Sequence, residues 1–393
     1  MAIYEKAEFK ITVKSPIHIG GFEQKITRFE FLPYGRYIYP VSESRLSLFL
    51  QKHNLISAYC AEVERLGHKF NLTDFFSNKR IQLTPEILEN LSFGKKIQIM
   101  GNIGNIQFYK PFIRDGFGKP YIPGTSIKGV FRTAIIYNLL KQIKQQNHVK
   151  FIKEIEERIE RDINKDKDKK NKKKFFDWGN IEYFEKFVLM NKRNSPNTDM
   201  NKRNSPNTDW LRMLHITDAY SENEIQTILI PVNILKKQRN GWQYKTENTN
   251  QRTTIWVECI PVGTTLRFEA KWDKRLLAEF KRENPDTTMP EDIQSVLKCI
   301  NQWAQDVMDF EKNFLKGHSL QRWYEFNRPN LRIGFGSGMT ATTISLLLSE
   351  QLRKKIRNYA GLNRGDDEAP KSRRLFERDN TSIPLGWALI ERI

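Results

Sequence analysis

Alternation of apolar and polar residues predicts several strands along the chain. Near the N-terminus, Phe9, Ile11 and Val13 alternate with polar residues across 8–14, a pattern typical of a half-buried strand. The segment TTLRFEAKW alternates in the same way, and other segments are rich in β-branched and aromatic residues. We therefore expect strands at 211–219, 225–234, 253–260, 264–272 and 384–390, and a hairpin at 27–39 that turns at Pro33-Tyr34-Gly35.

Helical spacing of apolar residues accounts for other parts of the chain. Residues 127–140 carry a strong apolar face, and Ser126 or Thr125 is a natural N-cap for a helix that begins there. Further helices are predicted after Ser42, over 275–317 and from about 342 to 357.

The middle of the chain has the composition of an exposed insertion. Residues 165–174 contain seven lysines in ten positions, which favours a solvated loop over a packed segment. The sequence MNKRNSPNTD then occurs twice in succession, at 190–199 and 200–209. One extra ten-residue copy is too short for a solenoid, so we interpret it as a tandem duplication tolerated in a loop.

Charge and cysteine content narrow the class of partner. The 393 residues suffice for about two domains, and 65 Lys and Arg against 46 Asp and Glu give a net charge of +19. This excess indicates a polyanionic partner, and without a basic amphipathic helix we favour nucleic acid over a membrane surface. The three cysteines, Cys60, Cys259 and Cys299, are too widely spaced for a zinc ribbon and are typical of a cytosolic protein. No apolar run is long enough to span a membrane.

Gly124 and Gly129 have the spacing of a P-loop but not its chemistry. Val130 and Phe131 stand where a P-loop needs Lys and Ser or Thr, so ATP hydrolysis is not expected. The segment still begins a helix, where backbone N–H groups together with Lys128 and Arg132 could meet a phosphate. The alternative is a plain helix start with two exposed cations.

A second glycine motif, GFGSG at 334–338, follows a predicted strand. It lacks the G-x-G-x-x-G spacing, and no acid for a ribose follows about 20 residues later, so a nicotinamide cofactor is not expected. Three glycines let a phosphodiester approach the backbone closely, and Arg332 adds charge. The alternative is a tight turn without a ligand.

Four titratable residues are candidates for catalysis. His18 lies in the loop after the first strand, where a general acid–base role competes with a structural hydrogen bond. His215 and Asp218 could reach it only through the fold, and Asp218 is as easily a turn or cap residue. Asp115 precedes Gly116 and is first of all a turn signal.

Several segments in a fixed order resemble the RAMP proteins of CRISPR systems. They are SPIHIGG after the first strand, YIPGTSIKGVFR at a helix start, VECIPVGTTLRFE, and the late RIGFGSG. Within that family, RIGFGSGMTATT and the ending PLGWALI most resemble one subunit of type III-A effector complexes. That subunit caps the backbone filament near the 3′ end of the guide RNA (crRNA) and is implicated in maturation of that end.

This resemblance implies an α+β fold of two ferredoxin-like (RRM-like) domains, which we place at 1–210 and 211–393, with helical and loop insertions. It also implies a cytoplasmic, non-catalytic protein that needs no metal, nucleotide or other cofactor. The implied partners are crRNA, the other RAMP subunits of the complex and host nucleases that trim the crRNA, with no membrane. RNA contacts are implied at His18, Gly20, Gly21, Ser126, Lys128, Arg132, Arg332, Gly334, Gly336 and Gly338.

Two other functions remain open at this point. A metal-independent endoribonuclease that processes guide RNA would use His18 and Asp218. The sibling subunits of the family cut target RNA with a loop aspartate, for which Asp115 is the closest candidate in this sequence. A purely structural adaptor would make no RNA contact, but the net charge of +19 argues against it.

Overall fold

The computed structural model describes most of the chain, in residue ranges 3–92, 94–101, 106–167, 181–185, 187–188, 209–238, 241–246, 252–285, 287–361 and 367–393. Most of the lysine-rich segment and the repeated decapeptide, except Asp209, lie outside these ranges.

The strands of the described residues are β1 (Tyr4–Val13), β2 (Ile26–Thr27), β3 (Phe31–Tyr34), β4 (Tyr37–Pro40), β5 (Ile97–Ile99), β6 (Phe108–Tyr109), β7 (Leu214–Ile216), β8 (Ile228–Gln238), β9 (Gly241–Tyr244), β10 (Thr254–Cys259), β11 (Thr265–Asp273), β12 (Leu331–Arg332), β13 (Ser372–Arg378), β14 (Thr381–Pro384) and β15 (Trp387–Arg392). The helices are α1 (Glu43–Lys52), α2 (Ile56–Leu66), α3 (Leu72–Asn78), α4 (Pro85–Ser92), α5 (Gly124–Gln146), α6 (His148–Phe151), α7 (Glu157–Lys167), α8 (Ile181–Glu185), α9 (Lys274–Glu283), α10 (Ile293–Phe314), α11 (Leu320–Phe326), α12 (Gly338–Thr342) and α13 (Glu350–Tyr359).

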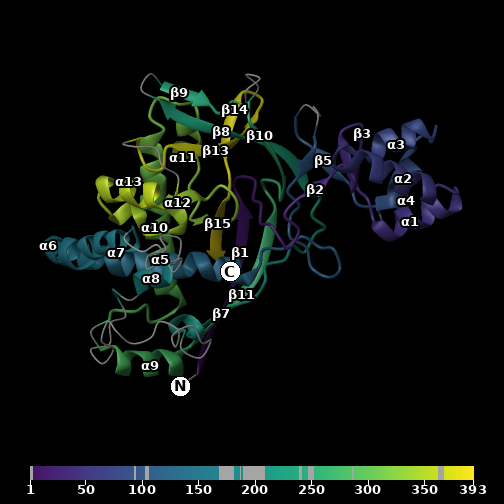
Figure 1. Cartoon of the computed structure of the whole chain (residues 1–393). Coiled ribbons are helices and arrows are strands. Elements are labelled where there is room, and N and C mark those ends of the chain that lie inside the picture. Colours follow the sequence, from purple (N-terminus) through teal and green to yellow (C-terminus); the bar gives the residue numbers. More distant parts are fainter. Residues whose placement is uncertain are drawn as a thin grey trace.

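The first strand, β1, lies at the centre of a five-stranded antiparallel sheet with the order β12-β15-β1-β11-β7. Phe9, Ile11 and Val13 are fully buried, as the alternation predicts, and face helices α5 and α10 in one large apolar core. Helix α5 crosses this region in Figure 1, below α10. The buried face of the sheet therefore fixes where the loops after β1 and β12 emerge.

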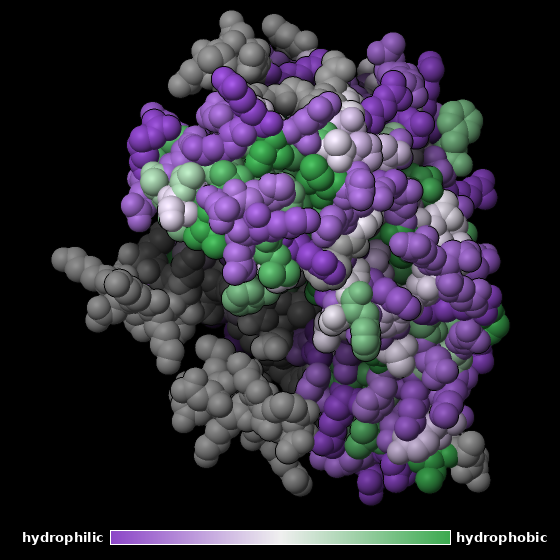
Figure 2. Space-filling model, turned by 90° about the vertical axis from the view of Figure 1, so that its right-hand side faces the viewer, coloured by the Kyte–Doolittle hydropathy of each residue, from purple (hydrophilic) through white to green (hydrophobic). Residues whose placement is uncertain are grey.

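A second sheet is built around β8, which pairs with β5, β9, β10 and β13. Strands β3 and β4 form the predicted hairpin at its far end, with Gly35 in the turn at a positive φ of 57°. They lead into a lobe of helices α1–α4 that projects to the right in Figure 1 and has its own small core. Figure 2 shows a band of hydrophobic side chains on this lobe, where Leu48 and Ile56 are exposed.

Three predicted helices differ in their bounds from the observed ones. The segment 275–317 forms two helices, α9 and α10, because Pro285 and Pro290, which lie between them, cannot continue a helix. The segment 342–357 contains the end of α12, an extended residue at Thr343, and then α13 from Glu350. Helix α5 begins earlier than expected, at Gly124.

The α+β class is confirmed, but the strands do not separate at residue 210. Strand β1 comes from the first predicted domain, whereas the other four strands of its sheet come from the second. One apolar core also extends across residues from both halves. The division into two ferredoxin-like domains at 1–210 and 211–393 is therefore not a division between separate sheets.

Candidate nucleic-acid interface

The two glycine-containing loops singled out in the sequence lie against each other. The first glycine loop (residues 15–22) and the second glycine loop (residues 333–338) are joined by a hydrogen bond from the Phe335 N–H to the His18 carbonyl, 2.8 Å long. Gly334 has a φ of 78°, and a Cβ there would lie 2.1 Å from the His18 carbonyl oxygen. Only glycine allows this approach, so the junction explains why the second loop is glycine-rich at this point.

His18 is buried and held by the backbone. Its Nδ1 lies 2.7 Å from the Glu258 carbonyl oxygen and must donate to it, which leaves Nε2 without a proton in the neutral ring. Burial lowers the pKa of His18 more than the contact with Glu258 raises it, so the neutral form is favoured at pH 7. Phe112 and Phe335 pack edge-on against the imidazole. These contacts favour a structural hydrogen bond over a general acid–base role for His18.

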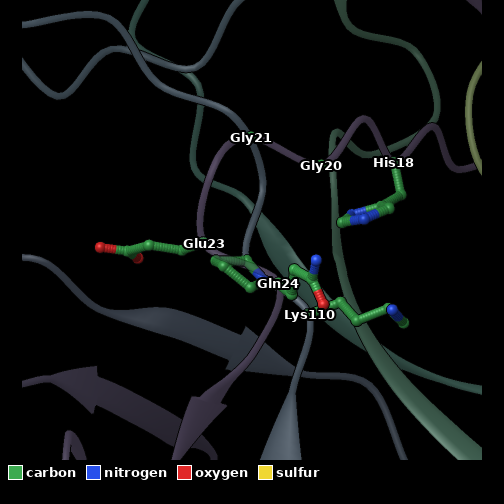
Figure 3. Close-up of a pocket in the computed structure, with 7 residues that line it drawn as sticks. His18, Gly20, Gly21, Glu23, Gln24 and Lys110 are labelled. Carbon is green, nitrogen blue, oxygen red and sulfur yellow. The ribbon is translucent and has the colours of Figure 1, made fainter.

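A small polar pocket opens beside the first glycine loop. It has a volume of about 180 Å³ and is lined by His18, Gly20, Gly21, Glu23, Gln24, Lys110 and Pro111. In Figure 3 the His18 ring faces the side chains of Gln24 and Lys110, whereas Glu23 points away. The Lys110 ammonium also lies 6.0 Å from the centre of the Phe335 ring. Three of the predicted RNA contacts, His18, Gly20 and Gly21, thus share one pocket with a cation.

Glu258 organises this region and was missed by the sequence analysis. Its carboxylate accepts hydrogen bonds from the Phe112 N–H (2.8 Å), the Arg114 guanidinium (2.5 Å) and the Thr227 hydroxyl (2.6 Å). The side chain is almost fully buried. The one signal in the sequence was a carboxylate within the apolar strand segment WVECI, since a buried charge there requires partners.

Asp218 serves the start of α5 and does not contact the histidine. The Gly124 N–H donates to its Oδ1 at 2.7 Å, so this distant carboxylate caps the helix. The expectation that Thr125 or Ser126 is the N-cap is wrong, because α5 already begins at Gly124 and Ser126 lies inside its first turn, half-buried. His215 is exposed on β7.

Arg132 lies in an ion-pair cluster and not toward solvent. Its guanidinium is 2.6 Å from both Glu185 and Asp209, and it packs beside the Trp210 ring. Burial raises the pKa of Asp209, but the hydrogen bonds and charge of Arg132 outweigh this and leave the pKa below its ordinary value. Lys128 is half-buried near the same carboxylate, and burial lowers its pKa. The alternative of a plain helix start with two exposed cations is therefore wrong for Arg132, whose predicted contact with RNA stays a prediction.

Arg332 is buried and holds the second glycine loop by a hydrogen bond. Its side chain is 2% exposed, donates to the Gly336 carbonyl at 3.1 Å and lies 3.5 Å from Glu311. The guanidinium also stacks over the Trp387 ring at 5.0 Å. Arg332 therefore positions Gly336 with a buried guanidinium, and its predicted contact with RNA stays a prediction. Gly336 and Gly338 both adopt positive φ, as their place in the loop requires.

Asp115 forms a turn. Its Oδ1 accepts from the N–H groups of Phe117 and Lys119, each at 2.9 Å. This is the local role that an Asp-Gly pair favours.

The chain belongs to the RAMP superfamily, whose sequence model matches residues 10–303. It is also similar to Csm5 of Streptococcus thermophilus, described as "CRISPR system Cms protein Csm5", with 28% identity over 162 residues. That match covers 37% of this chain and 42% of the length of the curated relative. Csm5 is the subunit whose likeness the sequence segments predicted, and the prediction is confirmed.

Two solved structures share the fold over nearly the whole chain. One is a chain of the cryo-EM structure of a Csm–crRNA–target RNA ternary complex of a type III-A CRISPR–Cas system, with a TM-score of 0.64 and 23% identity. The alignment covers 98% of this chain and all of that one. The other is the crystal structure of T. onnurineus Csm5, with a TM-score of 0.60, 20% identity, and coverage of 97% and 99%.

No helix of the described residues is long and apolar enough to cross a membrane. Within the same part of the chain, no three His, Cys, Asp or Glu side chains gather as metal ligands would.

Proposed function

We propose that this chain binds guide RNA as a subunit of a type III-A CRISPR ribonucleoprotein. In this proposal it caps the backbone filament near the crRNA 3′ end and supports crRNA maturation in antiviral defence. The observation that carries it is the junction of the two glycine loops beside a pocket that contains Lys110. Kinship with the RAMP superfamily and likeness to Csm5 support the same role.

Contact with the RNA backbone is the mode that this surface favours. Gly20 and Gly21 leave room for a phosphodiester to approach the chain, and Lys110 supplies a positive charge beside them. Lys128 adds a second cation near the start of α5. Since backbone contacts carry no sequence information, guides of different sequence would bind in the same way.

We also propose that the subunit is not an enzyme. Three features support this: the neutral, hydrogen-bonded state of His18, the use of Asp218 as a helix cap, and the turn made by Asp115. The alternative is a metal-independent endoribonuclease, and the proximity of His18 to Lys110 in one pocket is the feature that favours it.

The proposed partners follow from the same role. They are crRNA, the other Csm and RAMP subunits of the complex, and host nucleases that trim the crRNA 3′ end. A cytoplasmic location and two ferredoxin-like domains also belong to this proposal. Likeness to a chain of the Csm–crRNA–target RNA complex supports the first two partners.

A salt titration with the purified full chain tests RNA binding. Because Lys and Arg release counterions from RNA, log affinity should fall with log salt by about 0.7 per phosphate contact on a single strand. An affinity for crRNA that does not respond to salt would contradict the proposal. Discrete RNA products that disappear in the His18→Ala variant would instead support the endoribonuclease.

A further inference from the structure

Two phenylalanines, one at the end of the first glycine loop and one in the turn at 115–119, are almost fully exposed. Phe22, directly after Gly20-Gly21, has a relative exposure of 103%, and Phe117 has 92%. A single exposed apolar side chain needs no explanation, but these two lie on loops that meet each other. The Ile113 N–H donates to the Ile19 carbonyl at 2.8 Å, and Ile113 lies against Gly21. The loops that carry the two rings therefore meet at one junction.

The turn that carries Phe117 is firmly built. Asp115 accepts from the Phe117 and Lys119 N–H groups, and Arg114 donates to the Gly118 carbonyl at 2.9 Å. The Arg114 guanidinium is in turn held by buried Glu258. The backbone that carries the Phe117 ring is therefore ordered before any ligand arrives, which lowers the entropic cost of binding.

Lysines lie on or beside the loops that carry these rings. The Lys95 ammonium lies against Gly118, next to Phe117, and Lys119 is exposed on the other side of the turn. Where the first glycine loop leads into β2, the Lys25 ammonium lies 5.7 Å from the centre of the half-exposed Phe108 ring. Aromatic rings interleaved with cations suit the bases and phosphates of a single-stranded nucleic acid. A surface that docks a protein partner through the same rings would instead surround them with apolar side chains.

We propose that Phe22 and Phe117 are stacking platforms for unpaired bases of the bound RNA. The inference rests on the proposed RNA-binding function and adds base contact to backbone contact at this one place. Every base has a flat face, so stacking adds affinity without selecting a sequence. The rings thus hold nucleotides that are not engaged in pairing with a target.

The test compares two RNA probes on the full chain. One is a single-stranded 20-nucleotide RNA, and the other is the same backbone with abasic sites throughout. The protein variants are Phe22→Ala, Phe117→Ala and the double replacement, with Phe326→Ala as a matched control because that ring is 82% exposed at the end of α11. Each of the first two replacements should weaken binding of the ordinary RNA about 10-fold, within the range measured for one stacked base.

The double variant should bind ordinary and abasic RNA equally, because both changes remove the same interaction. Circular dichroism should be unchanged, since the rings are exposed. Equal affinity of the parent and the double variant for ordinary RNA would overturn the inference, as would an equal loss in Phe326→Ala. Unchanged RNA affinity with lost assembly into the Csm complex would overturn it in favour of protein docking. A parent that binds neither probe would overturn the proposed function itself.

Discussion

At the scale of single residues, the junction of the two glycine loops depends on one missing side chain. Replacing Gly334 with Ala places a Cβ 2.1 Å from the His18 carbonyl oxygen and requires a positive φ that Ala rarely adopts. The strain and the displaced loop should lower the free energy of unfolding by about 2–3 kcal/mol, as measured by urea titration. RNA affinity should fall as well, because both loops contribute to the proposed site.

Gly129 provides the matched control for that prediction. It lies inside α5, is exposed, and an added Cβ would meet nothing within 4 Å. Gly129→Ala should therefore raise stability by about 0.5–1 kcal/mol, the usual gain of Ala over Gly within a helix. A Gly334→Ala variant as stable as Gly129→Ala would contradict the close approach seen here.

Single-residue roles were predictable only where the cause was local. Asp115 beside Gly116 predicted a turn, and a turn is present. Asp209, a partner of Arg132, lies 77 residues away from it, and Glu258, the partner of the His18 ring, lies 240 residues away, so no pattern along the chain could indicate them. Glu258 was missed for the same reason, since its three partners converge only after folding.

At the scale of elements, a buried carboxylate on α10 joins β12 to β13. Glu311 lies 2.5 Å from Arg373 and 3.5 Å from Arg332, which holds Gly336. Burial would raise the pKa of Glu311, but the charges of Arg373 and Arg332 outweigh it and keep the pKa below its ordinary value. The second glycine loop is therefore positioned through this cluster.

Glu311→Gln should lower stability at pH 7 by roughly 3 kcal/mol, because two buried arginines lose their counter-charge. A depressed pKa means that the carboxylate stabilises the fold fully above the ordinary value near 4.5 and loses that contribution as pH falls through the lowered pKa. The difference between parent and variant should thus narrow below about pH 4.5 in urea unfolding. The pair Glu350–Lys354, in which the glutamate is exposed, is the control, and Glu350→Gln should cost under about 1 kcal/mol.

Helix α5 carries two cations with different roles. Arg132→Ala should destabilise the protein by about 2 kcal/mol, because it leaves Glu185 and Asp209 without their shared partner. Lys128→Ala should change thermal unfolding little and should instead weaken RNA binding with a shallower salt slope. Equal stability of the two variants would contradict the ion-pair role of Arg132. Unchanged RNA affinity in Lys128→Ala would remove this helix from the RNA site.

Elements were predictable where their own residues decide the conformation. Strand β1 and the β3–β4 hairpin follow from alternation and from Gly35 in the turn. Pro285 and Pro290 signal the break between α9 and α10. It was missed because the apolar residues on both sides have helical spacing, which predicts one continuous helix. The start of α5 at Gly124 depends on a cap from Asp218, 94 residues away.

At the scale of the whole molecule, strand order determines which parts of the chain can fold alone. The resemblance to RAMP proteins predicted the α+β class correctly, since segments from Phe9 to Trp387 carry it in order. A boundary at residue 210 could not be tested from the sequence, because strand pairing between distant segments leaves no local trace. The observed pairing places β1, the first strand of the chain, between β11 and β15, and β15 is the last strand of the chain.

Fragments 1–210 and 211–393 should therefore fail to fold when expressed separately. The second fragment would lack the central strand of its sheet, and the apolar faces of β11 and β15 would lose the buried Phe9, Ile11 and Val13 between them. Co-expression should restore a complex that unfolds cooperatively, because the missing strand returns with its full register of partners. Thermal unfolding followed by circular dichroism measures both cases, with the intact chain as control. A cooperative transition in 211–393 alone would show that β11 and β15 can close the sheet without β1, and would support a division into two domains at residue 210.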